Sequence, residues 1–185
     1  MRDYQEFAKE ELYMQNVEFY ILDAIDFIRC GWADKVMVLF STIGNSGFIW
    51  ILLTLALIIS KKYRKTGIVL AIALILGLIV SNVLIKNIVA RPRPCWINTD
   101  VQLLIKNPTD YSFPSGHTQA GFIAVFVLWF REFKYWWSAL ALASVIAFSR
   151  LYLYVHFPSD VLGGIVIAFI ISYVVCRICK KRVLN

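Results

Sequence analysis

The sequence predicts an all-α membrane protein, a polytopic bundle of about five transmembrane helices preceded by an amphipathic helix at the membrane interface. Hydrophobic residues make up 59% of the 185 residues and charged residues only 17%, which departs in both directions from the composition of soluble domains. Residues 67–85 carry no charge over 19 positions, a length that can cross a bilayer. The acidic N-terminus lacks an early apolar core, so we expect no cleavable signal peptide.

Residues 1–35 are expected to form a separate amphipathic segment at the membrane surface. Apolar side chains recur there at helical spacing on one face, and charged residues occupy the other faces. The apolar positions are Val17, Tyr20, Ile21, Ala24, Ile25 and Ile28, and the charged positions are Glu18, Asp23, Asp26 and Arg29. We expect this helix to end at Gly31-Trp32.

Five apolar stretches are expected to cross the membrane within one domain, residues 36–185. They cover about residues 36–60, 67–90, 117–130, 136–154 and 161–179. Several apolar cores are shorter than the roughly 20 residues that a bilayer requires, so polar residues must enter the span ends. The first stretch is either one long span or an interfacial helix followed by a span from about Gly44. The second must stop at Arg91-Pro92-Arg93-Pro94, because proline disfavours helical geometry in the residue before it.

The distribution of charge orients the chain and argues against nucleic acid as a partner. Eight of the twelve acidic residues lie in residues 1–34, whereas basic residues flank the apolar runs. Segments 61–65, 131–134 and 177–182 together hold ten Lys and Arg, against seven on the other side. Because basic loops stay in the cytoplasm, we expect a cell-membrane protein with a cytoplasmic C-terminus.

The four cysteines give weak signals. Cys176 and Cys179 have the spacing of a redox motif or of half a zinc site, but no further Cys or His lies near them in the sequence. Buried apolar side chains are therefore the favoured interpretation. Cys30 and Cys95 would lie on the same side of the membrane and could pair, although nothing in the sequence requires it.

Polar residues at the span ends converge on one face of the membrane, which the charge bias predicts to be extracytoplasmic. A charged residue inside an apolar span is costly and indicates a shared polar cavity. These residues are Lys86 and Arg93 at the end of the second span, Ser115, Gly116 and His117 at the start of the third, and Ser149, Arg150, His156 and Asp160 between the fourth and fifth.

The residue types on that face suit phosphoryl transfer. Cationic side chains and the free amides of a helix that Ser115 caps would neutralise phosphoryl oxygens. Both histidines of the chain lie here, so one can attack phosphorus while the other protonates the leaving oxygen. Each feature also has an ordinary explanation: a polar boundary histidine, a basic helix end at Arg91-Pro-Arg-Pro, or a first-turn acid at Asp160. Those separate explanations do not account for the placement of all these residues on the same face of the membrane.

The motifs together resemble the signature of the type 2 phosphatidic acid phosphatase (PAP2) superfamily. The matching residues are Lys86 with six residues before Arg93-Pro94, then Pro114-Ser115-Gly116-His117, then Ser149-Arg150 with His156 and Asp160. The resemblance implies a membrane lipid phosphatase that needs no metal and no other cofactor. It implies that His156 is the nucleophile, that Asp160 orients it, and that His117 is the acid and then the base. Lys86, Arg93, Ser115, Gly116 and Arg150 would bind the phosphoryl group.

The resemblance implies a phosphorylated lipid as substrate but leaves its identity open. Family substrates include undecaprenyl pyrophosphate, phosphatidylglycerophosphate and phosphatidate, and the small size and short loops are similar to bacterial members. Phosphotransfer to another alcohol through the same phosphohistidine remains an alternative, as does a non-catalytic lipid or anion carrier. Soluble vanadium haloperoxidases share the signature, but five hydrophobic spans argue against them. The oligomeric state is open.

Overall fold

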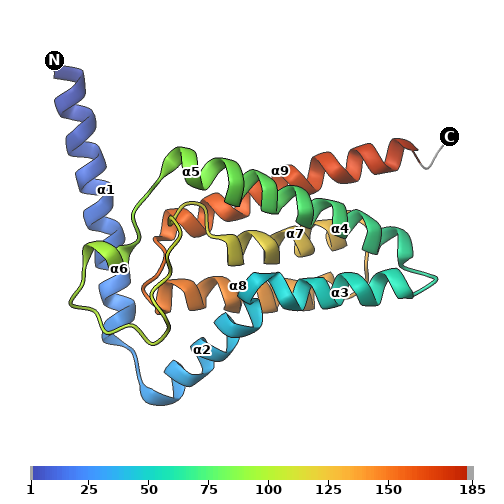
Figure 1. The fold of residues 1–185 in the computed structure, drawn as a ribbon, viewed down its shortest axis with the longest axis horizontal. Helices are drawn as coiled ribbons and strands as arrows, with labels where there is room; N and C mark the ends of the chain where they lie inside the picture. Colours follow the sequence, from blue (N-terminus) through green and yellow to red (C-terminus); the bar gives the residue numbers. More distant parts are fainter. Residues whose placement is uncertain (1, 183–185) are drawn as a thin grey trace.

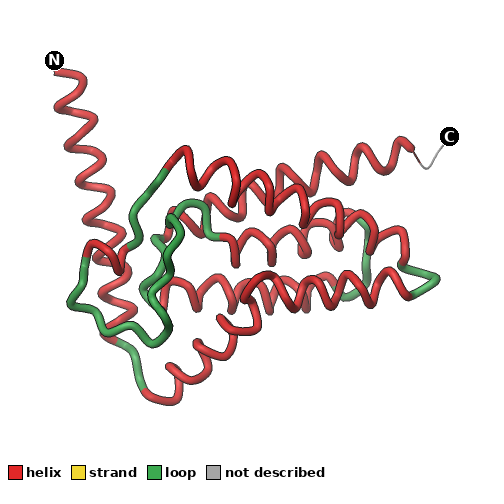
Figure 2. Tube along the Cα trace, in the orientation of Figure 1, coloured by secondary structure: helices red, strands yellow, loops and turns green. Residues whose placement is uncertain are grey.

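The computed structural model describes residues 2–182, and these residues form helices and loops with no strand among them (Figure 2). The all-α prediction is confirmed. The predicted segments 1–35 and 36–185 each include terminal residues outside this range, and the division between them stays a prediction.

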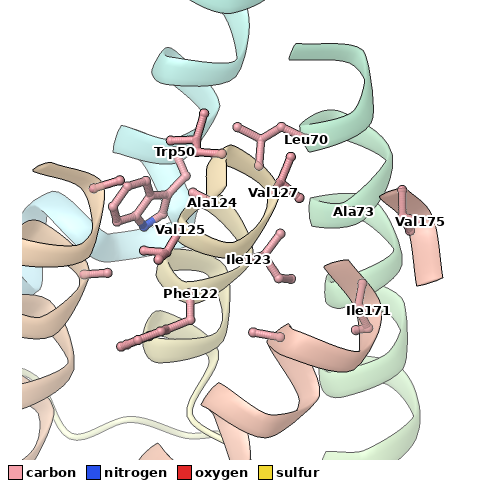
Figure 3. Packing of buried hydrophobic residues seen from close by; sticks show 14 of the residues in the cluster. Trp50, Leu70, Ala73, Phe122, Ile123, Ala124, Val125, Val127, Ile171 and Val175 are labelled. Atoms are coloured by element: carbon pink, nitrogen blue, oxygen red, sulfur yellow. The ribbon is translucent and has the colours of Figure 1, made fainter. Parts of the chain in front are cut away.

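The apolar helices of the chain run alongside one another as a bundle (Figure 1). They are α3 (Phe48–Ile59), α4 (Arg64–Leu78), α7 (Gly116–Phe130), α8 (Trp136–Tyr152) and α9 (Pro158–Arg182). Helix α7 packs against the other four. Its side chains are accordingly the most buried of the bundle, and Ile123, Ala124 and Val127 lie in the core beside Trp50 of α3 and Leu70 of α4 (Figure 3).

Within residues 2–182, three helical stretches are long and apolar enough to cross a membrane: Gly31–Ile59, Arg64–Ile97 and Pro158–Cys179. Helices α7 and α8 have 15 and 17 residues and lie within the same bundle, as the short apolar cores predicted. Large apolar side chains also cover the outside of the bundle, among them Ile59, Ile88 and Leu162. Such an apolar exterior is typical of a surface that lipid covers.

The first apolar stretch is broken into two helices, which answers the question that the sequence left open. Helix α2 (Gly31–Gly44) leads into a short turn, η1 (Asn45–Gly47), before α3 begins. Ser46 and Gly47 have φ values of 53° and 67°, outside helical geometry. Helix α2 therefore leaves the direction of α3 (Figure 1).

The second apolar stretch also changes its helical geometry before it ends. Helix α4 continues as a π-helical segment, η2 (Ile79–Ile85), and then as α5 (Lys86–Val89). The chain leaves the helix at Ala90, which has φ 48°, next to the prolines expected to stop it. A short helix, α6 (Pro94–Ile97), follows. A wide π turn directly before Lys86 is a feature that often accompanies functional sites.

The N-terminal helix α1 (Arg2–Phe27) extends from one end of the bundle (Figure 1). The expected end at Gly31-Trp32 was wrong, because α1 ends at Phe27 and Gly31 starts α2. Apolar residues of α1, including Val17 and Tyr20, are exposed, whereas Leu22 is fully buried against the chain. Helix α9 likewise begins at Pro158 rather than Val161, because proline suits the first turn of a helix.

Candidate active site

A cavity of about 970 Å³ lies at the end of the bundle where α5 ends, α7 begins and α8 turns into α9. The long loop 98–115 and the α2–α3 break also border this end (Figure 1). Six of the predicted site residues line the cavity: Lys86, Arg93, Gly116, His117, Arg150 and His156. Ser115 and Asp160 are fully buried behind the wall, so the structure brings these residues close without exposing them to the cavity.

Three cationic side chains from different elements face the cavity. Lys86 and Arg93 are buried, and both pair with Asp110 of the 98–115 loop, the Arg93 contact measuring 2.8 Å. Arg150 donates to Ser41 Oγ of α2, and its Nε has no partner. Buried cations without compensation are costly. This cluster of three cations contains only one carboxylate, that of Asp110, and can therefore bind a further anion.

Asp110 was missed by the sequence reasoning. It is one acid within a polar loop, and no local pattern distinguishes it. Burial alone would raise the pKa of Asp110, but the hydrogen bonds and charges of Lys86 and Arg93 outweigh burial and lower the pKa to about 2. The carboxylate therefore stays ionised between the two cations throughout the neutral range.

His156 is held with one ring nitrogen toward Arg93 and the other toward Asp160. Its Nε2 lies 3.1 Å from Arg93 Nη1, and its Nδ1 lies 3.5 Å from Asp160 Oδ2. Burial lowers the pKa of His156, Asp160 opposes this, and the charges of Arg93 and Arg150 lower it further, to about 3. His156 is therefore neutral at pH 7, and since Arg93 only donates, its Nε2 carries the lone pair.

Asp160 is fixed through both of its oxygens. Oδ1 accepts a hydrogen bond from Arg91 at 2.7 Å, and Oδ2 accepts from Ser112 Oγ and, at 2.8 Å, from the N–H of Phe157. Arg91 and Ser112 were not predicted as site residues. Arg91 had been assigned at most to a basic helix end, and the Ser112 contact joins residues 48 positions apart.

His117 faces the break between α2 and α3. Its Nε2 lies 2.9 Å from Asn45 Oδ1, and because an amide oxygen only accepts, Nε2 carries the proton. Close approach is possible because residue 44 is glycine: a Cβ there would lie 3.0 Å from the His117 ring. Asn45 is a further residue that the sequence reasoning missed, although it directly follows Gly44, where the alternative span was expected to start.

Ser115 occupies the N-cap position of α7 as predicted, but its side chain makes no capping hydrogen bond. Its Oγ accepts from Thr118 Oγ1 at 3.0 Å instead, and its N–H donates to the Asp160 carbonyl at 3.1 Å. The first backbone bond of α7 is donated by Gln119. The preceding amides of the helix start are thus left for an anion beside Gly116.

Neither the cysteines nor the acidic residues form a second centre within the described part of the chain. All four cysteines are free thiols. Residues 2–182 contain no group of three or more His, Cys, Asp or Glu side chains placed to hold a metal ion.

The family is decided by the sequence around this cavity. The family model of the PAP2 superfamily matches residues 66–184, a range that contains every predicted site residue. This chain belongs to the PAP2 superfamily. It is therefore a membrane phosphatase of that superfamily, and the resemblance drawn from its motifs is confirmed.

Individual PAP2 relatives cover most of the chain. An undecaprenyl-diphosphatase of Sulfolobus acidocaldarius is 32% identical over 164 residues, which is 88% of this chain and 78% of the relative. Phosphatidylglycerophosphatase B of Bacillus subtilis is 33% identical over 177 residues, 88% of this chain and 83% of the relative. The crystal structure of a transmembrane PAP2-type phosphatidylglycerolphosphate phosphatase from Bacillus subtilis shares the fold, with TM-score 0.76, 23% identity, and coverage of 91% and 87% of the two chains.

Proposed function

We propose that this PAP2 protein releases phosphate from a phosphorylated membrane lipid through a phosphohistidine at His156. The observation that carries the proposal is the cavity itself, where two histidines and three cations from three separate segments of the chain meet. Lys86, Arg93 and Arg150 bind the phosphoryl oxygens together with the Gly116 amide, and Asp110 gives up its place between the cations. Ser115 supports this cradle from behind, through the backbone that carries the amide.

The geometry supports a reaction in two steps. In the first, His156 Nε2 attacks phosphorus and the bond between phosphorus and the leaving oxygen breaks. That oxygen is the lipid ester oxygen of a monoester or the bridging oxygen of a pyrophosphate, and protonated His117 gives it a proton. In the second, His117 takes a proton from water, the resulting hydroxide attacks phosphorus, and the bond to His156 breaks to release phosphate. Asp160 holds the proton-bearing Nδ1 of His156 in both steps.

A prenyl pyrophosphate is the substrate that we rank first. The buried Lys86, Arg93 and Arg150 are joined at the cavity wall by Lys106, and four cations suit the charge of a pyrophosphate better than that of a monoester. One compared relative is named undecaprenyl-diphosphatase, which agrees with this ranking. The other is named phosphatidylglycerophosphatase B, so phosphatidylglycerophosphate is ranked second and phosphatidate third.

The lipid chain would enter through the apolar part of the wall. Ile51 of α3 and Ile75 and Leu78 of α4 line the cavity and are also exposed on the outside of the bundle. A lipid bound between α3 and α4 would therefore keep its hydrocarbon tail in the bilayer and place only its head group in the cavity. The residues at α5 and at the start of α7 that line the cavity belong to the end of the bundle opposite the basic loop 61–65 that joins α3 to α4 (Figure 1).

We place the cavity on the extracytoplasmic face, the C-terminus in the cytoplasm, and α1 with its exposed Val17 and Tyr20 at the membrane interface. The basic residues of loops 61–65 and 131–134 support this orientation. Labelling of single cysteines in intact cells with a membrane-impermeant reagent tests it. A cysteine at position 100, in the loop beside the cavity, should react, and one at position 62 should not; the reverse pattern would refute the orientation.

Phosphate release from a panel of lipid phosphates, in detergent containing EDTA, tests the function. The panel contains a prenyl pyrophosphate, phosphatidylglycerophosphate and phosphatidate, with and without an acceptor alcohol to reveal phosphotransfer. We expect His156→Ala to lose at least about 1,000-fold in kcat, because the nucleophile is gone. Full activity in His156→Ala would exclude the phosphohistidine, and lipid passage without hydrolysis would indicate a carrier.

A further inference from the structure

The N-terminal helix reaches the candidate active site through Glu18, a residue outside the range that matches the family model. Glu18 Oε1 accepts the N–H of Ser159 at 2.9 Å, and Oε2 pairs with Arg91. The Glu18 side chain is 8% exposed, and a carboxylate so buried is costly unless its oxygens are bonded. Both oxygens are bonded, and both partners belong to the frame of the site.

Arg91 connects Glu18 to the carboxylate beside the nucleophile. Its Nη1 donates to Asp160 Oδ1 at 2.7 Å and to Ser159 Oγ at 2.6 Å, and its guanidinium lies 4.1 Å from the centre of the Phe157 ring. One cation therefore bridges two carboxylates from distant parts of the chain. Neither Arg91 nor Glu18 lines the cavity, so neither would contact a bound substrate, and the hydrogen bond to Asp160 is their closest link to the nucleophile.

Helix α1 has a second polar contact with the α8–α9 turn that does not involve Asp160. Tyr154 donates to Asp23 Oδ1 at 2.7 Å, and Phe19 packs edge-on against Phe157 at 5.3 Å. Leu22 is buried with them. The docking of α1 is therefore shared between an apolar cluster and two acids, only one of which is linked to the site.

We propose that Glu18 and Arg91 are positioning residues for the reaction: α1 completes the site by fixing Arg91, and through it the orientation of Asp160 and His156. This inference rests on the proposed function, because it takes His156 as the nucleophile. It extends the site beyond the signature motifs to the N-terminal helix.

The kinetics of charge-changing variants test the proposal in the full-length protein. Farnesyl pyrophosphate in detergent serves as the probe. Glu18→Gln keeps the shape of the side chain, and we expect kcat to fall about 10-fold with KM within about two-fold, since misplacing a reacting group can cost up to 100-fold while the phosphate cradle is untouched. Arg91→Lys should lower kcat less than Arg91→Gln. The matched control Asp23→Asn, at the other acid of α1, should keep kcat within about two-fold.

The acid side of the pH–rate profile separates positioning from general loss of structure. The charged or titratable groups around the His156–Asp160 pair are Glu18 from α1, Lys86 from α5, Arg91 and Arg93 after α5, Asp110 from the loop, His117 from α7 and Arg150 from α8. Removing the negative charge of Glu18 disfavours imidazolium, so Glu18→Gln should move the acid limb to lower pH. Arg91→Gln removes a positive charge and should move it to higher pH.

The outcomes are distinct. Wild-type kcat in Glu18→Gln, or shifts of the two acid limbs in the same direction, would overturn the inference alone if His156→Ala is inactive. No phosphate release by the wild type, or full activity in His156→Ala, would remove the proposed function and this inference with it. If Arg91→Gln fails to fold by size-exclusion chromatography, kcat and the direction of the acid-limb shift in Glu18→Gln alone decide.

Discussion

Asp110 lies between Lys86 and Arg93, in the position that we propose for the phosphoryl group of the substrate. Both cations contact its carboxylate, which is half exposed at the cavity mouth. An anionic substrate must displace it, so the carboxylate competes with every anion that binds the cations. The competition holds above about pH 4, because the pKa of Asp110 is lowered to about 2.

Asp110→Asn should therefore tighten inhibition by inorganic phosphate. Removing the competing charge leaves Lys86 and Arg93 free for the ion, and we expect the inhibition constant to fall about three- to ten-fold, equivalent to about 1 kcal/mol. Phosphate inhibition of lipid hydrolysis at pH 7 measures it. Asp100→Asn, an exposed acid of the same loop, is the control and should change nothing; a weaker inhibition in Asp110→Asn would contradict the competition.

His156 should remain a competent nucleophile well below the ordinary pKa of histidine. Burial and the neighbouring arginines lower the pKa of His156 to about 3, so its neutral form persists as the pH falls from 7 to 4. Rapid-quench measurement of phosphohistidine formation between pH 4 and 7 should show no loss that follows a pKa near 6.5. A ten-fold decline in the rate of phosphohistidine formation, centred near pH 6.5, would show that the pKa of His156 is not lowered in this way.

At the scale of the helices, α3 and α4 approach each other closely at Gly67. A Cβ on Gly67 would lie 2.7 Å from the backbone nitrogen of Ile58, and backbone cannot move aside as a flexible side chain can. Gly67→Ala should therefore lower the free energy of unfolding by about 1–3 kcal/mol. Thermal unfolding in detergent measures it. Gly31→Ala, where nothing lies within 4 Å of the new Cβ, is the matched control; an equal melting temperature for both variants would contradict the packing argument.

An element could be predicted from the sequence when its start or end depends on adjacent residues, and could not when it depends on distant ones. The stop at Arg91-Pro92 follows from proline chemistry in adjacent residues, and the structure ends the helix at Val89. The break at Ser46 and Gly47 was only an alternative, because a small polar cluster is tolerated within a span as well as between helices. The π-helical segment 79–85 had no signal in the sequence, since its residues are apolar apart from Ser81 and Asn82 and an ordinary α-helix tolerates both.

At the scale of the whole molecule, the sequence predicted where in the fold the site lies better than it predicted every residue that contributes to the site. Hydropathy, charge bias and three spaced motifs were sufficient to bring Lys86, Arg93 and His156 to one end of a helix bundle. Glu18 was predicted only as a charged position on an amphipathic helix. Its contact with Arg91 joins residues 73 positions apart, and such a pairing depends on how α1 docks rather than on any local pattern. The catalytic roles themselves remain predictions until variants are measured.

The apolar wall formed by Ile51, Ile75 and Leu78 determines which measure of substrate concentration controls the rate of the proposed reaction. Because these side chains join the cavity to the outer, lipid-covered surface of the bundle, the proposed substrate would arrive by lateral diffusion within a membrane or micelle. The relevant quantity is then its mole fraction among the surrounding amphiphiles, not its amount per volume. Adding inert detergent at constant total substrate should lower the rate in proportion to that mole fraction, whereas a site fed from water would respond only to bulk concentration.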